Sequence, residues 1–284
     1  MIRRKKTRGV QRSKVEATFR YLLLTFMAIT ALVPGYIMFV GSFKTQGEFL
    51  NSPFGLPTSF NLGGYRAAWT DNFPHWLTNS FLIVTGAVVL TEILAALAAW
   101  GFARFPFKGR ETILGVMVSL MVVPPVVLLI PLFQLGVQLS LISTLRIVIL
   151  IYVGLMLPFS IYMLTNFFKS IPDSILESAS IDGASSFKTF RSIVLPLSGA
   201  PLATLAVVNL LWAWNELLLA LVFLQSNDKK TLMVGITGFQ SRYSLDIPTV
   251  MAGMSIATLP LVIAYLFGQR FFIAGLTAGS TKGE

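Results

Sequence analysis

The residues best suited to chemistry lie in unusually apolar surroundings. Two carboxylates, Glu92 and Glu216, fall inside long hydrophobic stretches, where burial of an acid is costly and usually indicates a function. Asn209, Trp212 and Glu216 follow at i, i+3 and i+7, a spacing that places them on one helix face, with Asn215 beside it. Amides hydrogen-bond hydroxyl pairs and indoles pack on apolar sugar faces, so these residues predict a substrate path.

Two other interpretations of these residues remain open. Glu92 and Glu216 would be the proton carriers if the chain were a proton-coupled secondary transporter. Alternatively, Glu216 bonds a neighbouring helix, and Glu92 makes a hydrogen bond between helices.

A second concentration of polar residues occurs at 177–197, "ESASIDGASSFKTFRSIVLPL", between two apolar stretches. Just before it, Pro172 and Asp173 suit the first turn of a helix. Gly183 suits the C-terminal end of that helix, and Ser185 or Ser186 can cap a second one. We expect two short helices joined at the glycine.

The second short helix carries its own apolar stripe. Phe187, Phe190 and Val194 fall on one face at helical spacing, and Lys188 and Arg191 fall elsewhere. Taken alone, this periodicity favours an ordinary amphipathic connector at a membrane surface.

Several kinds of chemistry are excluded by composition. The chain has no cysteine, and its single histidine, His75, has no acid or second histidine near it in sequence. No Gly-Lys dipeptide occurs, so the phosphate-binding loop of ATPases is absent. The chain therefore cannot hydrolyse ATP by itself, and any such energy must enter from a partner.

The elements that position these residues are predicted to be membrane helices. Only 12% of the 284 residues are charged, whereas a soluble domain has about 25%. We therefore expect an all-α membrane protein with six spanning helices of about 20 residues or more. The spans are 19–41, 77–102, 112–136, 145–168, 198–224 and 249–272. Pro124 and Pro125 predict a kink in the third.

Basic residues predict the orientation of these spans. Residues 1–18 form a basic tail, and the inner segments together contain 16 Lys and Arg against six outside. This bias places both termini in the cytoplasm. The tail is expected to meet anionic lipid and not nucleic acid. The segment 169–197 is then cytoplasmic, and the loops 42–76 and 225–248 lie outside, where Trp76 fits an interfacial aromatic belt.

The polar inner segment resembles the EAA loop of ABC importer membrane subunits, whose form is E-A-A-x-x-D-G-A followed by an aromatic residue and an L-P-L run. Ser178 replaces the first alanine of that pattern, a change between small residues. The resemblance implies that this loop is the coupling helix, which docks on a cytoplasmic ATPase. The implied coupling residues are Glu177, Ser178, Ala179, Asp182, Gly183, Ala184 and Phe187.

Further segments are similar to the maltose-type carbohydrate permeases. They include "GFARFPFKGR", "WNELLLALVFL" and the ending "GQRFFIAGLTAGSTKGE". In that family the tail, here 273–284, reaches the ATPase, and the loop before the last span enters the binding protein. The implied tail contacts are Gly275, Leu276, Thr277, Ala278, Gly279 and Lys282. The implied binding-protein contacts are Gly235, Gln240 and Tyr243.

The resemblance implies a type I ABC importer fold and a complete transport system. The chain would be the smaller permease subunit, forming half of the translocation path in the cell membrane and binding no cofactor itself. Its partners would be a second homologous permease, an ABC ATPase dimer that binds ATP and Mg, and an extracytoplasmic sugar-binding protein. The sequence does not indicate which sugar is carried.

Overall fold

Every regular element in the described part of the chain is a helix. The structure, a computed structural model, describes residues 14–70, 72–239 and 246–280. Within these ranges four helices are long and apolar enough to cross a membrane, and two bent helix pairs raise the number of candidate spans to six. The chain is therefore a multi-pass membrane protein with an all-α fold.

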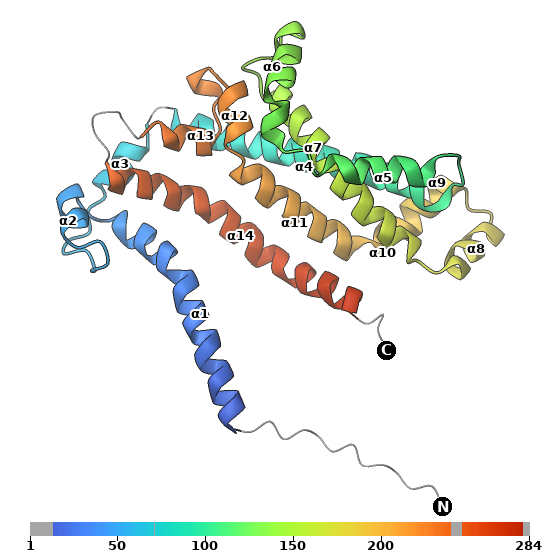
Figure 1. Cartoon of the computed structure of the whole chain (residues 1–284), viewed down its shortest axis with the longest axis horizontal. Coiled ribbons are helices and arrows are strands. Elements are labelled where there is room, and N and C mark those ends of the chain that lie inside the picture. The colour runs from blue at the N-terminus through green and yellow to red at the C-terminus, as the bar shows by residue number, and fades with distance from the viewer. Residues whose placement is uncertain (1–13, 71, 240–245, 281–284) are drawn as a thin grey trace, which may run out of the picture.

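The four long helices coincide with the predicted first, second, fourth and sixth spans. They are α1 (Lys14–Gly41), α4 (Phe73–Arg104), α7 (Leu145–Lys169) and α14 (Ile247–Ser280). In Figure 1, α4, α7 and α14 belong to one bundle, whereas most of α1 stands away from it and its end meets the start of α14. No residue in the most apolar stretch of α1 is buried within the chain. This helix therefore depends on lipid or on other subunits for its apolar contacts.

The third candidate span is bent where Pro124 and Pro125 predict a kink, and the kink is a complete break of the helix expected over 112–136. Three elements replace it: α5 (Arg110–Leu120), the 3-10 turn η1 (Pro125–Leu128) and α6 (Leu129–Gln138). The two halves meet at 94°, and α6 projects from the bundle (Figure 1). The break occurs at Pro124 and Pro125 because proline supplies no amide donor and disfavours helical geometry in the residue before it.

The fifth span is also shorter than the predicted helix over 198–224. Residues Gly199–Asn215 form α11, which ends at Asn215, and Leu218–Phe223 form a separate short helix, α12. Glu216 has an extended backbone, with φ −68° and ψ 119°. The polar residue that was expected on a helix face therefore lies in the break between two helices.

Short helices surround the end of the bundle that the basic residues predict to face outward. They are α2 (Gln46–Asn51), α3 (Gly63–Ala68), η3 (Asn227–Lys229) and α13 (Leu232–Thr237). The first outer segment is held by Lys44, whose buried ammonium donates to the carbonyl oxygens of Ser52 and Gly55, each at 2.6 Å. Four more elements complete the end predicted to face inward: α8 (Asp173–Ile181), α9 (Ser186–Thr189), the π-helical turn η2 (Phe190–Val194) and α10 (Leu195–Leu197).

The core lies along α4 and α7, where two clusters of buried apolar side chains meet. The outer cluster contains Trp76, Tyr152 and Trp214. The inner cluster contains Trp100 and Phe190, the second of which belongs to η2. The inner polar segment is therefore packed onto the bundle and is not a free loop.

Candidate functional site

The first half of the inner segment is the short helix α8, which ends as the sequence predicts. Gly183 has φ +73°, a left-handed conformation that glycine adopts without steric cost. The amide of Ala184 donates to the carbonyl of Ala179 at 2.9 Å, and that of Gly183 donates to the carbonyl of Ser180 at 3.0 Å. These two bonds form a Schellman motif, so the predicted helix stop at Gly183 is confirmed.

The second half begins with a capped turn, also as predicted. The hydroxyl of Ser185 accepts a hydrogen bond from the amide of Lys188 at 3.3 Å, which caps α9. The chain then passes through η2, in which Phe190 and Val194 are buried. Two short helices joined at Gly183 are therefore confirmed.

Polar groups and large apolar side chains are both exposed on this segment. Glu177, Ser178, Asp182 and Gly183 are exposed, Ala184 is half-buried and Ala179 is buried. The side chain of Phe187 is 64% exposed, whereas those of Phe190 and Val194, at the same helical spacing, are buried. Ile181 is 86% exposed. Exposed isoleucine and phenylalanine beside carboxylates form a surface suited to another protein.

Two residues without a predicted role hold this segment against the bundle. Trp100 and Arg104, one turn apart at the end of α4, bond to α9 and α8 respectively. The available signal was an arginine in the last turn of a long apolar helix, within the family-like run "GFARFPFKGR".

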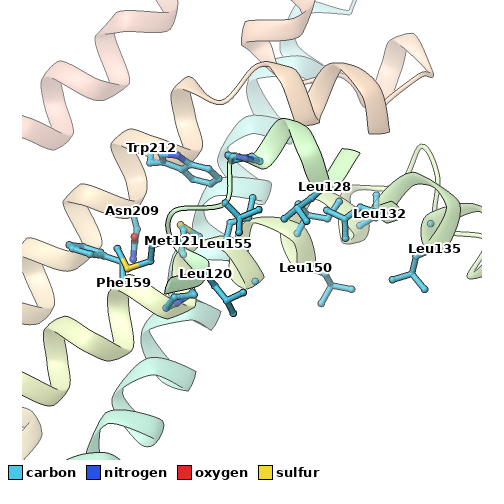
Figure 2. Close-up of a pocket in the computed structure, with 18 of the residues that line it drawn as sticks. Leu120, Met121, Leu128, Leu132, Leu135, Leu150, Leu155, Phe159, Asn209 and Trp212 are labelled. Atoms are coloured by element: carbon cyan, nitrogen blue, oxygen red, sulfur yellow. The ribbon is translucent and has the colours of Figure 1, made fainter. Parts of the chain in front are cut away.

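A cavity of about 710 Å³ opens beside the break in the third span. Its walls come from the end of α5, from η1 and α6, and from facing positions of α7 and α11. Leucines are the most frequent lining residues, and Figure 2 shows Leu128, Leu132 and Leu135 on the right, with Asn209 and Trp212 on the left. The lining of the cavity is therefore mostly apolar, with one side-chain amide and one indole.

Two of the predicted path residues reach this cavity. Asn209 and Trp212 both line it. The amide nitrogen of Asn209 donates to the hydroxyl of Ser160 at 3.2 Å, and Asn209 is buried. Trp212 is more open, and its ring lies edge-on to Tyr152 with centroids 5.2 Å apart. Trp212 is therefore the better placed of the two to meet a substrate.

The other two predicted path residues lie elsewhere, because α11 ends before the expected stripe is complete. Asn215 donates from its side chain to the carbonyl of Leu211, one turn back in its own helix. Glu216 accepts hydrogen bonds from the hydroxyl of Tyr152 and from the amides of Leu219 and Ala220. Its carboxylate therefore supports the helix break, in agreement with the alternative that it bonds a neighbouring helix.

Glu92 is half-buried in α4. Its Oε1 atom is buried and has no hydrogen-bond partner among the described residues. The structure thus provides no partner for the hydrogen bond between helices that was expected here.

The outer loop differs from the expected contact surface. Gly235 is buried, and a Cβ at this position would lie 2.1 Å from the ring of Trp76. Trp76 is itself buried and donates to the carbonyl of Asn227 at 2.7 Å, so it is not an interfacial belt residue. Gly235 therefore allows close packing and is not an exposed contact. Gln240 and Tyr243 lie outside the described residues.

The predicted C-terminal contacts lie at or beyond the end of α14. The backbone of Gly275, Leu276, Thr277, Ala278 and Gly279 continues this helix, whose last residue is Ser280. Only their backbone is described, and Lys282 lies outside the described residues.

Comparison with known proteins gives consistent matches over most of the chain. Residues 92–277 match the family described as "Binding-protein-dependent transport system inner membrane component". A putative ABC transporter permease protein of Caldicellulosiruptor sp. (strain Rt8B.4) is 38% identical, with 93% of this chain and 96% of that protein covered. The trehalose/maltose transport system permease of Thermococcus litoralis is 36% identical, with 91% and 94% covered.

A solved structure has the same fold. It is a crystal structure of a bacterial ABC transporter involved in the import of the acidic polysaccharide alginate. One chain of it superposes with a TM-score of 0.80 at 22% identity, covering 93% of this chain and all of the other. None of these matches supports a proton-coupled secondary transporter.

Proposed function

Because the chain belongs to the family of binding-protein-dependent transport system inner membrane components, we propose that it forms half of the membrane path of an ATP-driven sugar importer. The sugar class is supported by the relative named as a trehalose/maltose permease and by the maltose-type motifs of the sequence. A second, homologous permease supplies the other half of the path.

Six membrane crossings with both termini in the cytoplasm complete the proposed architecture. Four long helices and two bent pairs provide six candidate spans. The excess of Lys and Arg in the tail and in alternate connections supports this orientation. It places α8 and α9 on the cytoplasmic side and α2, α3 and α13 on the outer side.

The observation that carries the proposal is that the segment 177–197 has an exposed surface and is also packed onto the bundle. Glu177 and Asp182 lie beside the exposed side chains of Ile181 and Phe187, while Phe190 and Val194 fix the segment in the core. A surface that is both apolar and charged suits contact with another protein. Because this segment is anchored in the core, a displacement of the bound partner would also move the bundle. The partner proposed for it is the ATPase dimer, which binds ATP and Mg.

The mechanism is alternating access driven from this surface. Closure of the ATPase dimer on ATP displaces α8 and α9, and the bundle turns so that the path opens outward to a sugar-binding protein. Hydrolysis restores the inward-facing form. Inverting a 1:99 population requires a difference of about 5.5 kcal/mol between the two states, so the contact with the ATPase must hold in both.

The cavity beside the break in the third span is the proposed contribution to the path. Trp212 offers an aromatic face to a sugar. The remaining wall is largely leucine, so most hydrogen bonds to the sugar must come from the second permease. We assign the tail 273–284 to ATPase contact, and the loop 225–248, through Gln240 and Tyr243, to contact with the binding protein.

Substitution of Gly183 tests the coupling role. No other atom lies within 4 Å of a Cβ placed there, so an added side chain would project into open space where the ATPase docks. Asparagine tolerates the left-handed conformation better than other residues. We expect Gly183→Asn to insert normally but to lose ATP-driven uptake in proteoliposomes and to weaken ATPase binding.

Gly109 offers a matched control. It has φ +84°, is also free of neighbours within 4 Å, and lies in the other inner connection. Gly109→Asn adds the same side chain in the same backbone conformation away from the proposed docking surface, and uptake should stay near that of the unmodified chain. Normal uptake by Gly183→Asn would contradict the proposal.

A further inference from the structure

The last turn of α4 is bonded to the joint between α7 and the coupling helix α8. The guanidinium of Arg104 donates through Nη2 to the carbonyl oxygens of Phe168 at 2.6 Å and Ile171 at 2.8 Å. Its Nη1 atom donates to a carboxylate oxygen of Asp173, also at 2.6 Å. Arg104 thus contacts the end of α7, the connection and the first residue of α8 at once.

A second contact joins α4 to the other half of the segment. The indole nitrogen of Trp100, one turn before Arg104, donates to the hydroxyl of Ser186 at 3.2 Å. The Trp100 ring also lies 5.8 Å from that of Phe190, measured between centroids. Both halves of the segment are therefore attached to the same turn of α4.

The bonds of Arg104 stiffen a place where the chain would otherwise bend. Carbonyl groups at the end of a helix lack partners within the helix, and only residues 170–172 separate α7 from α8. By binding carbonyls on the α7 side and a carboxylate on the α8 side, the planar guanidinium fixes the angle between the two helices. Pro172 adds to this because its ring fixes one backbone torsion.

We propose that Arg104 is a positioning residue that makes α4, α7 and α8 move as one body during transport. This inference rests on the proposed coupling function of α8. A displacement imposed on α8 by the ATPase then reaches both central helices and is not absorbed at 170–172. Arg104 touches neither nucleotide nor substrate in this role.

The role depends on the geometry of arginine and not on its charge alone. The Arg104 side chain is 16% exposed, whereas that of Asp173 is 79% exposed. An ion pair with so exposed an acid contributes little, so the two carbonyl bonds matter most. Lysine keeps the charge but has one compact ammonium that cannot reproduce the fork of donors.

The decisive experiment measures ATP hydrolysed per sugar imported by the assembled transporter in proteoliposomes. For Arg104→Lys we expect assembly and ATP hydrolysis to persist while this ratio rises about tenfold, within the range of known coupling energies. For Asp173→Asn the ratio should stay within about twofold of the unmodified value.

Two further variants complete the test. One changes a control arginine, and the other increases the flexibility of the connection 170–172 by a different substitution. Arg110 lies nearby and bonds the side chain of Glu111, so Arg110→Lys should leave the ratio unchanged. Pro172→Gly frees the joint without removing an Arg104 bond, so it should raise the ratio even if Arg104→Lys fails to accumulate.

An unchanged ratio in Arg104→Lys, or in Pro172→Gly when the first variant does not accumulate, would overturn the inference. That outcome would not contradict the proposed function. The proposed function is contradicted separately, if Gly183→Asn imports sugar normally.

Discussion

The hydroxyl of Tyr152 on α7 donates a 2.7 Å hydrogen bond to the carboxylate of Glu216, which lies in the break between α11 and α12. The same carboxylate accepts the amides of Leu219 and Ala220 at 2.8 and 3.1 Å. Within a membrane these amides have no water to bond. Glu216 therefore allows α11 to end and α12 to begin within the apolar region.

Removal of this carboxylate should destabilise the break. We expect Glu216→Ala to lower the free energy of unfolding by about 1–3 kcal/mol for each donor left without an acceptor. Glu216→Gln retains one acceptor oxygen and should cost less. Tryptophan fluorescence of the purified complex on heating measures both. If Glu216→Gln abolished uptake without changing stability, the carboxylate would have a transport role that the hydrogen bonds do not explain.

The outer loop is held in place by the contact between Gly235 and Trp76. A methyl group at 235 would overlap the indole, so Gly235→Ala should cost about 1–3 kcal/mol through overpacking. Gly47 lies in α2 on the same side with no atom within 4 Å of a Cβ, and Gly47→Ala should not destabilise. Thermal unfolding of the two variants makes the comparison, and equal transition temperatures would rule out the packing role.

The first outer segment depends on buried Lys44. Lys44→Met keeps much of the side-chain volume but leaves the carbonyls of Ser52 and Gly55 without their donor. The expected result is faster amide hydrogen exchange across 46–58 and about 1–3 kcal/mol of lost stability. Exchange in α13 should not change. Unaltered exchange across 46–58 would show that the lysine does not hold this segment.

The cavity residue Trp212 should affect substrate affinity. Loss of its aromatic face in Trp212→Ala is expected to raise the KM for sugar uptake about two- to tenfold, the equivalent of about 0.5–1.5 kcal/mol. Asn215→Ala changes an exposed residue of the same last turn that does not line the cavity. Its KM should be unaltered. A KM for Trp212→Ala equal to that of Asn215→Ala would remove Trp212 from the path.

The elements that depend on local signals were predictable from the sequence. Gly183 marks a helix end because only glycine takes a positive φ freely, and Ser185 caps the next helix through its own hydroxyl. The long apolar stretches of α1, α4, α7 and α14 likewise follow from composition alone.

Features that depend on tertiary contacts were not predictable. The end of α11 before Glu216 requires a tyrosine from α7, distant in sequence, to share the carboxylate. Phe187 and Phe190 share one helical spacing, which does not reveal that the first side chain is exposed and the second enters the core. The role of Arg104 depends on carbonyl groups 64 and 67 residues away, which no periodicity reveals.

Photo-crosslinking within the assembled transporter measures whether the segment around Gly183 docks on the ATPase. Ile181 and Phe60 are similarly exposed, at 86% and 82%, but lie on opposite sides of the proposed membrane. With a benzophenone amino acid at either position, we expect an adduct with the ATPase from 181 and none from 60. An adduct from 60, or none from 181, would contradict it.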